Sequence, residues 1–246
     1  MSVSVSGRRT GHRVRVVFGA VAAVVLLSVS AVNAQKGSFT DPRDDKKYRT
    51  VKIGNLTWMA QNVNYATSSG SFCYDDDLSN CAKYGRLYTW SAAKSAACPP
   101  GWRLPDNMEW NDLTKSAGGQ RKEVVKGRAY WSDVGKKLKS KTGWSDFLCD
   151  QNVKEALNKI GEDCVLDKMN SGNGTDNFGF SALPGGYRLP NGSFSNAGKF
   201  GSWWSATEVE FGSGKAWIRY MNSDRGNVGE INDGKGNGCS VLCVQD

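Results

Sequence analysis

Seven cysteines limit the folds open to this chain more than any other feature of its 246 residues. All seven follow an N-terminal segment, residues 1–34, that has the pattern of a signal peptide. This segment has a basic start, an apolar run from Val16 to Val29, and small residues before a cleavage point after Ala34. Because exported proteins keep their cysteines oxidised, disulfides are favoured over metal binding.

A membrane anchor is the alternative interpretation of the same segment. The apolar run is shorter than the roughly 20 residues that a membrane-spanning helix needs, so cleavage is the expectation. No cysteine follows the run in the position of a lipid attachment site. We therefore expect a protein that is secreted or held in the outer cell envelope, without a membrane span after signal cleavage.

The spacing of the cysteines predicts three disulfides. Cys73 and Cys81 bracket a short acidic loop, and Cys149 and Cys164 bracket a predicted helix. Cys98 is expected to pair with Cys243, near the C-terminus. The remaining cysteine is then Cys239, although it could compete with Cys243 for Cys98.

Charge argues against a nucleic-acid partner. The signal segment holds 4 of the 32 basic residues and none of the 24 acidic ones, which leaves a net charge of +4 (28 minus 24). Such a small excess does not indicate nucleic-acid binding. A local basic run within 121–141 is interpreted as a solvated helix face and loop.

The single histidine, His12, lies in the signal segment. The mature chain therefore cannot form a Ser-His-Asp or Cys-His catalytic set, or a zinc site with an imidazole ligand. Carboxylate pairs for glycoside cleavage remain available, but none has a spacing that implies two opposed acids. A non-catalytic role is the expectation.

The stretch from Cys98 to Trp110 predicts a fixed corner. Two prolines and a glycine end the preceding element, and Leu104-Pro105 keeps the chain extended. Asp106 can then cap a helix from Asn107 to about Ala117, with Glu109 completing a capping box.

Other patterns place this corner in an α+β domain. A polar linker is expected over 35–47, followed by a domain over 48–246. The domain should open with a hairpin, Val51–Ile53 and Leu56–Trp58. Further helices are predicted over Trp90–Ala97 and from an Asp150 cap to Ile160. Short antiparallel strands are predicted later, at Phe178–Leu183, Trp203–Thr207, Ala216–Met221 and Ser240–Val244.

Several motifs, in order, resemble those of the Fibrobacter succinogenes major paralogous domain family. They are Asp41-Pro-Arg-Asp-Asp, Tyr48-Arg-Thr-Val-Lys-Ile-Gly, Trp58-Met-Ala-Gln-Asn, Tyr84-Gly-Arg-Leu-Tyr-Thr-Trp, the corner from Cys98 to Trp110, Gly174-Thr-Asp-Asn-Phe-Gly-Phe, Trp203-Trp-Ser-Ala-Thr-Glu and Ser240-Val-Leu-Cys-Val. The resemblance implies an exported surface module with a C-type-lectin-like fold, disulfide-stabilised, with short antiparallel strands and two to three helices. The family is also similar, more distantly, to the formylglycine-generating enzyme domain.

The lectin-like resemblance implies a possible cofactor, calcium. Such domains commonly hold calcium with an Asn-Asp pair on a strand near the C-terminus, and Asn232-Asp233 stands in a comparable place. The enzymatic relative implies instead an oxidase that uses a reactive cysteine pair, for which Cys239 and Cys243 are the candidates.

Aromatic residues supply the remaining functional indication. Neighbours on a strand point to opposite faces, so one ring of Trp203-Trp204 should leave the core unless both faces are covered. We expect a ligand surface around this pair, with Asn222, Asp224 and Asn227 on a nearby loop. The leading hypothesis is a module that binds carbohydrate, either plant cell-wall polysaccharide or envelope glycan. A structural or protein-protein adhesion module, contacting a cell-surface protein, is the alternative.

Overall fold

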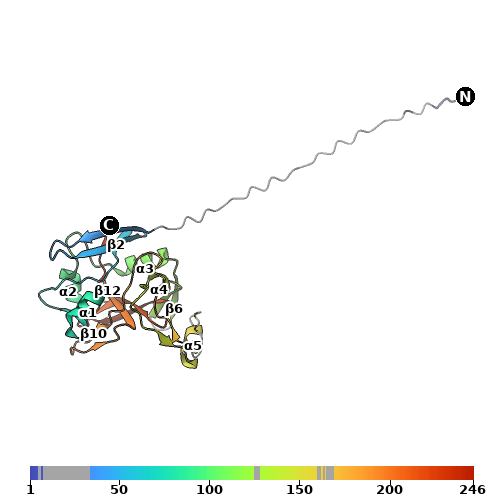
Figure 1. The fold of residues 1–246 in the computed structure, drawn as a ribbon. Coiled ribbons are helices and arrows are strands. Elements are labelled where there is room, and N and C mark those ends of the chain that lie inside the picture. The colour runs from blue at the N-terminus through green and yellow to red at the C-terminus, as the bar shows by residue number, and fades with distance from the viewer. Residues whose placement is uncertain (5–6, 8–33, 125–127, 160–161, 163, 165–168) are drawn as a thin grey trace. The chain divides into compact units, whose positions relative to one another are not determined.

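The computed structural model describes residues 1–4, 7, 34–124, 128–159, 162, 164 and 169–246. The chain divides into two compact units, residues 1–32 and 33–246, and the second unit carries the fold (Figure 1). The predicted signal peptide lies almost wholly outside the described residues. The second unit is a mixed α and β fold with several antiparallel sheets and three disulfides.

Two larger sheets organise the unit. The first has the order β1-β2-β3-β15, with β1 (Gln35–Thr40), β2 (Lys47–Ile53), β3 (Leu56–Met59) and β15 (Val244–Gln245). The second has the order β12-β13-β14-β7-β6, with β12 (Phe200–Glu208), β13 (Lys215–Asn222), β14 (Val228–Gly234), β7 (Arg128–Ser132) and β6 (Gln120–Val124). All neighbouring strands of both sheets run antiparallel.

Shorter elements connect these sheets. Three two-stranded pairs join β4 (Ser71–Phe72) to β5 (Leu87–Tyr88), β8 (Phe147–Leu148) to β9 (Met169–Asn170), and β10 (Tyr187–Arg188) to β11 (Phe194–Ser195). The α-helices of the described residues are α1 (Leu78–Tyr84), α2 (Trp90–Ala92), α3 (Asn107–Ser116), α4 (Gly135–Leu138) and α5 (Gln151–Asn158). A π-helix, Ala93–Ala97, continues α2.

The corner and its helix form as the sequence predicts. The Asp106 carboxylate accepts a bond from the Glu109 amide at 2.9 Å, and the Glu109 carboxylate accepts one from the Asp106 amide at 2.8 Å. This capping box fixes the start of α3, which places Trp110 and Leu113 in the core. The predicted hairpin is β2 and β3, with Gly54 at a positive φ of 65° in its turn.

The three disulfides join Cys73 to Cys81, Cys98 to Cys243, and Cys149 to Cys164, as the cysteine spacing predicts. Cys239 is the free cysteine and is buried. The Cys98–Cys243 bond ties the end of the π-helix to the segment before β15, so it joins the central corner to the C-terminal end of the domain.

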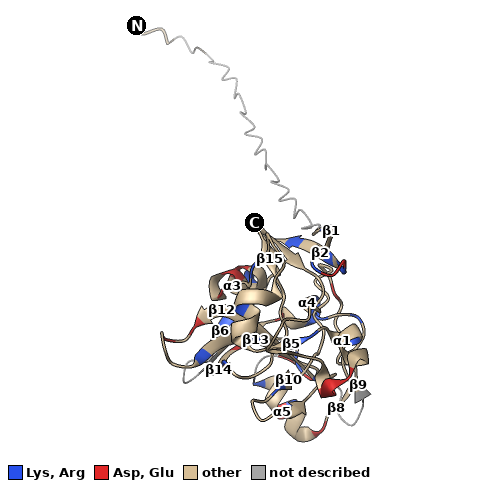
Figure 2. Ribbon diagram, turned by 90° about the vertical axis from the view of Figure 1, so that its left-hand side faces the viewer, with Lys and Arg blue, Asp and Glu red and all other residues tan. Residues whose placement is uncertain are grey.

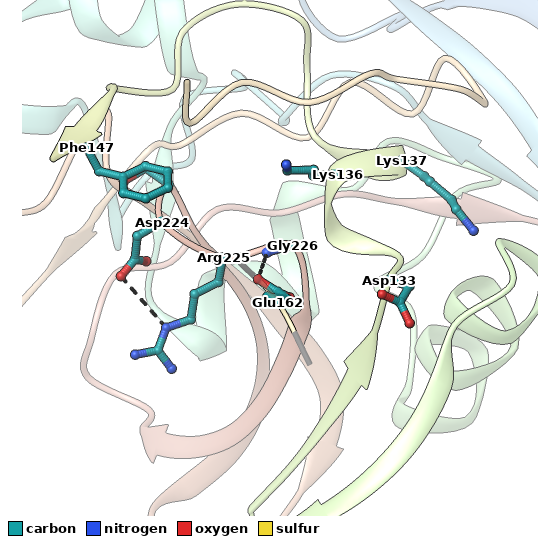
Figure 3. Close-up of a pocket in the computed structure, with 9 residues that line it drawn as sticks. Asp133, Lys136, Lys137, Phe147, Glu162, Asp224, Arg225 and Gly226 are labelled. Atoms are coloured by element: carbon teal, nitrogen blue, oxygen red, sulfur yellow. Dashed lines mark hydrogen bonds and ion pairs between the residues drawn. The ribbon is translucent and has the colours of Figure 1, made fainter. Parts of the chain in front are cut away.

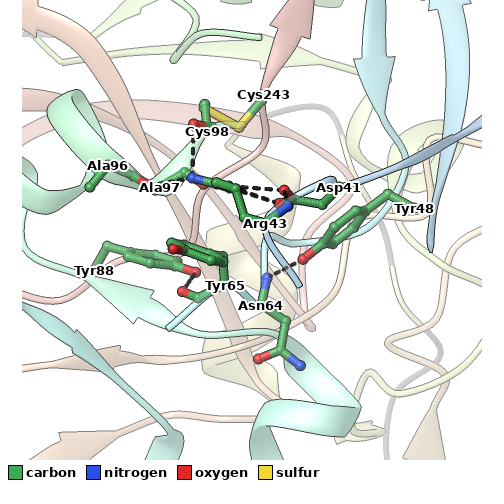
Figure 4. The surroundings of a disulfide bond; sticks show 10 residues. All are labelled: Asp41, Arg43, Tyr48, Asn64, Tyr65, Tyr88, Ala96, Ala97, Cys98 and Cys243. Atoms are coloured by element: carbon green, nitrogen blue, oxygen red, sulfur yellow. Dashed lines mark hydrogen bonds and ion pairs between the residues drawn. A yellow bond between two sulfur atoms is a disulfide. The ribbon is translucent and has the colours of Figure 1, made fainter. Parts of the chain in front are cut away.

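The stretch predicted to be a linker, 35–47, is part of the fold. Residues 35–40 form β1, which pairs along its whole length with β2. Arg43 then makes a paired contact with the buried Asp41 at 2.7 and 2.9 Å, and donates to the carbonyl groups of Ala96, Ala97 and Cys98 (Figure 4). Its guanidinium carbon lies 3.7 Å from the centre of the Tyr65 ring. These contacts hold the start of the domain against its central corner. The polar composition of residues 35–47 gives no indication of them.

Two other sequence predictions differ from the structure. The basic run within 121–141 was interpreted as a helix face and loop, but it contains β6, β7 and α4. Arg121, Lys122 and Glu123 are consecutive, exposed and paired with β7, so the polar composition of β6 masks a strand at the edge of the sheet. The predicted strand Phe178–Leu183 is a loop instead, apart from a single bridge at Ala182, and it inserts Phe180 into the core. The predicted helix from Asp150 is α5, and its expected end at Ile160 lies outside the described residues.

The core is an aromatic cluster between α3 and the two sheets. The rings of Trp58 and Trp110 are 5.0 Å apart, and Phe180 and Trp203 lie within 6.5 Å of the Trp110 ring. All four side chains are buried. Because α3 and this cluster cover one face of the five-stranded sheet, we call that face the inner face and the opposite one the outer face.

Candidate functional site

The two tryptophans expected at a ligand surface are both buried. Trp203 points to the inner face and donates its indole proton to Asn62 at 2.8 Å. Trp204 points to the outer face, where it donates to the Tyr88 carbonyl at 2.6 Å. The prediction of an exposed ring is wrong, because the β5 segment and the chain around Cys239 cover this part of the outer face.

The Asn232-Asp233 pair does not fit one calcium ion. Both residues lie on β14, where Asn232 pairs with Trp217 and Asp233 with Ala216. Consecutive strand residues point to opposite faces, so the two side chains diverge. Within the described parts of the chain, no group of three or more His, Cys, Asp or Glu side chains is placed to hold a metal ion.

The cysteine pair of the oxidase hypothesis is also not assembled. Cys243 is bonded to Cys98, and Cys239 is 1% exposed. Burial raises the pKa of the Cys239 thiol to about 12. A buried thiol of this kind is unreactive, because the thiolate is the nucleophile.

A hollow on the outer face of the five-stranded sheet is the best candidate for a ligand site. We call it the aromatic hollow; it has a volume of about 460 Å³. Its lining residues are Tyr187, Leu189, Asn196, Phe200, Ser202, Ile218, Asn222, Ile231, Asp233, Asn237 and Cys239. The sheet positions it because Phe200, Ile218, Ile231 and their register partners all share the outer face.

Three partly exposed aromatic rings form a row at this hollow. Phe200 stacks on Tyr220 with ring centres 5.5 Å apart, and Tyr187 meets the Phe200 ring edge-on at 5.8 Å. Tyr220 lies over Gly229 of the next strand, where any larger residue would collide with the ring. The glycine therefore lets the aromatic row lie flat on the sheet.

Polar groups stand beside the aromatic row. Asn196, Asn222, Asn237 and Asp233 contribute amide and carboxylate groups to the same hollow. One Asp233 oxygen accepts a bond from the Gly234 amide at 2.8 Å, which fixes the carboxylate at the wall of the hollow. The site thus combines an apolar platform with donors and acceptors.

Two more hollows adjoin the first along the loop between β13 and β14. A middle hollow of about 420 Å³ shares Asn196, Phe200 and Asn222 with the aromatic hollow. A charged hollow of about 280 Å³ shares Phe147, Ser223 and Asp224 with the middle one (Figure 3). The loop 222–226 therefore runs beside all three.

Contacts from behind hold this loop in place. The Lys139 ammonium donates to the carbonyl groups of Asn222 at 2.8 Å, Gly172 at 3.1 Å and Ser223 at 3.4 Å. Burial lowers the pKa of Lys139 to about 8. Gly226 donates to a Glu162 carboxylate oxygen at 2.6 Å, and the Gly226 carbonyl accepts from the Gly135 amide at 2.6 Å. Burial raises the pKa of Glu162 above its ordinary value.

The predicted site residues thus separate into two groups. Asn222, Asp224 and Asp233 line the hollows. Asn227 and Asn232 do not line them; Asn227 is buried behind the loop.

Sequence reasoning missed the aromatic row. Its strongest signal was the alternation in Ala216–Met221, which places Ile218 and Tyr220 on one face. Tyr187 and Phe200 gave no such signal, because they come from a short pair and from the first residue of a strand.

Comparisons with known proteins identify the family of this chain. A comparison with curated proteins and one with solved structures found no match. In the described part of the chain, every helix falls short of the length and apolar character that a membrane span requires. A family model, the Fibrobacter succinogenes major domain, matches residues 51–245 and so takes in the five-stranded sheet and all three disulfides, but not β1 or the start of β2. The chain belongs to the Fibrobacter succinogenes major domain family.

Proposed function

We propose that this protein is a non-catalytic, exported module that binds carbohydrate on the outer face of its five-stranded sheet. The observation that carries the proposal is the row of Tyr187, Phe200 and Tyr220 beside the amide and carboxylate groups that line the aromatic hollow. A sugar ring has an apolar face and a rim of hydroxyl groups. Aromatic rings match the first, and amide and carboxylate oxygens match the second.

The polysaccharide class we propose is plant cell-wall polysaccharide or envelope glycan. A neutral sugar needs no metal when aromatic stacking and hydrogen bonds hold it. We therefore propose binding that is independent of calcium, since Asn232 and Asp233 point to opposite faces.

A lectin-like fold and an extracellular or outer-envelope location complete the proposal. Pairing of β15 with β3 brings the two ends of the domain into one sheet, and this supports a C-type-lectin-like arrangement. Three disulfides in a chain of this size support an oxidising compartment.

The test compares two aromatic residues on opposite faces of β13. The purified protein, Tyr220→Ala and Trp217→Ala are assayed against a panel of soluble and insoluble plant and envelope polysaccharides, with calcium and with chelator. Tyr220 is on the outer face and stacks on Phe200, which lines the aromatic hollow, whereas Trp217 is on the inner face and is also partly exposed. We expect Tyr220→Ala to weaken binding about tenfold, because it removes the ring that supports Phe200, and losing an aromatic hot-spot contact costs more than about 1 kcal/mol.

Trp217→Ala should bind like the unaltered protein, and chelator should have no effect. Equal affinity of all three proteins would place the site elsewhere. If no polysaccharide binds, the carbohydrate proposal fails.

A second candidate function rests on Phe211. This side chain is fully exposed at the tip of the β12–β13 hairpin and is followed by Gly212 and Gly214. An apolar ring held out on a hairpin suits insertion into a pocket of a cell-surface protein. Protein-protein adhesion is therefore the alternative, and Phe211→Ser should abolish it while leaving polysaccharide binding unchanged.

A further inference from the structure

The three hollows beside the loop 222–226 form a series. Neighbouring hollows share lining residues: Phe200 and Asn222 join the aromatic and middle hollows, and Phe147 and Asp224 join the middle and charged ones. Each measures about 280 to 460 Å³. A pocket for one small ligand typically has a volume of roughly 300 to 1,000 Å³, so one such hollow already takes a sugar unit. The series is longer than a single unit can fill.

The shared wall of the series is a fixed surface. The loop 222–226 is anchored by Lys139 on one side and by Glu162 and Gly135 on the other. A ligand that contacts this loop therefore meets preformed groups and does not have to order them, which lowers the cost of binding.

The charges along the series favour an uncharged ligand. Its lining includes Asp133, Asp146, Glu162, Asp224 and Asp233, and against them Lys136, Lys137, Lys199 and Arg225. Some pair locally, as Arg225 and Asp224 do at 3.8 Å. Figure 2 shows basic and acidic segments interspersed over the ribbon. With both signs this close, no field of one sign attracts a polyanion.

We propose that the three hollows act as one groove for several consecutive units of a linear, uncharged polysaccharide. This inference rests on the proposed function and adds the length and the charge class of the ligand. The first unit stacks on the aromatic row, and later units pass Phe147 towards the charged hollow. Affinity then increases with the number of units until the groove is filled.

The experiment is calorimetric titration with β-1,4-linked gluco- and xylo-oligosaccharides, from the disaccharide to the hexasaccharide. Oligogalacturonides of the same lengths supply the charged comparison. The variants are Tyr220→Ala, Phe147→Ala and, as a matched control, Phe211→Ala, which removes a ring outside the groove. Circular dichroism shows that each variant keeps the fold.

We expect affinity to rise at least tenfold from disaccharide to hexasaccharide, and the galacturonides to bind no better than the neutral chains. Tyr220→Ala should weaken every length, whereas Phe147→Ala should weaken the hexasaccharide and leave the disaccharide unchanged. The proposal is overturned by affinity that does not depend on length, by a Phe147→Ala variant that binds the hexasaccharide normally, or by tighter galacturonide binding. Binding of no oligosaccharide, or an unaffected Tyr220→Ala variant, would instead refute the proposed function.

Discussion

Replacing the Cys98–Cys243 disulfide should cost more stability than replacing the Cys73–Cys81 disulfide, although both remove two sulfur atoms. The first bond closes a loop of 145 residues and the second a loop of 8. In the chain-entropy relation, such loops stabilise by about 5 and about 2.5 kcal/mol respectively at 25 °C. The expected difference of about 2.5 kcal/mol comes from the unfolded chain, which gains more freedom when the long loop is opened.

The pair of variants is Cys98→Ala/Cys243→Ala and Cys73→Ala/Cys81→Ala. Three of these four cysteines are buried and Cys98 is partly buried, so both variants lose similar packing and the small loop serves as the matched control. Urea unfolding monitored by tryptophan fluorescence gives the free energy of unfolding and the slope m. If the long-loop variant is too unstable in buffer, sucrose keeps its transition measurable, since excluded osmolytes strengthen burial.

The slope m supplies a second, independent readout. Opening the long loop lets the unfolded chain expand, so m should increase more for Cys98→Ala/Cys243→Ala than for the control. Equal losses of stability in the two variants, or a greater loss for the short loop, would refute the loop-size argument. The stabilisation would then come from local packing around each bond.

Three further predictions concern single side chains. Arg43→Met should lower the free energy of unfolding by about 3 kcal/mol, because it leaves the buried Asp41 carboxylate without its cation. In the same urea titration, Arg43→Lys should restore only part of the lost stability. Full restoration by lysine would contradict the importance of the two-bond contact. The folded protein releases the Lys139 proton at about pH 8, before the unfolded chain does near 10.5, so the free energy of unfolding should rise with pH across this window. Lys139→Met should remove that rise, and an unchanged slope would exclude Lys139 as its source. Cys239 should resist iodoacetamide at pH 8 in the folded protein, and in urea it should take up one label, as measured by mass spectrometry. Fast labelling of the folded protein would contradict the burial of this thiol.

Much of the fold follows from local chemistry in the sequence. The capping box at Asp106 and the Gly54 hairpin depend on residues a few positions apart, so both can be predicted from the sequence. Cysteine spacing was enough to pair Cys73 with Cys81 and Cys149 with Cys164, but it left Cys239 as a second possible partner of Cys98.

The predictions that were wrong concern residues whose contacts are distant in sequence. The polar composition of 35–47 suggests a linker, yet Arg43 reaches carbonyl groups more than 50 positions away. Trp204 is covered by a segment that only the folded chain brings over the sheet. Strand β6 has the sequence of a basic loop because it lies at the edge of the sheet, where residues 120–123 are all exposed.

The candidate site was predicted only in part for the same reason. The Asn-rich loop could be identified from composition, and Asn222, Asp224 and Asp233 do line the hollows. The aromatic row could not, because Tyr187, Phe200 and Tyr220 come from three strands whose register sets their contact.

The position of β15 has a consequence for how the nascent chain folds. Synthesis delivers β1, β2 and β3 first, but their sheet stays one strand short until Val244 emerges. Until then Val51 and Trp58 of the hairpin belong to a sheet that lacks its last strand, so a partly made chain exposes apolar side chains that favour aggregation. Folding should therefore be post-translational, and removing the residues from Val244 onward should leave a chain that accumulates as aggregate.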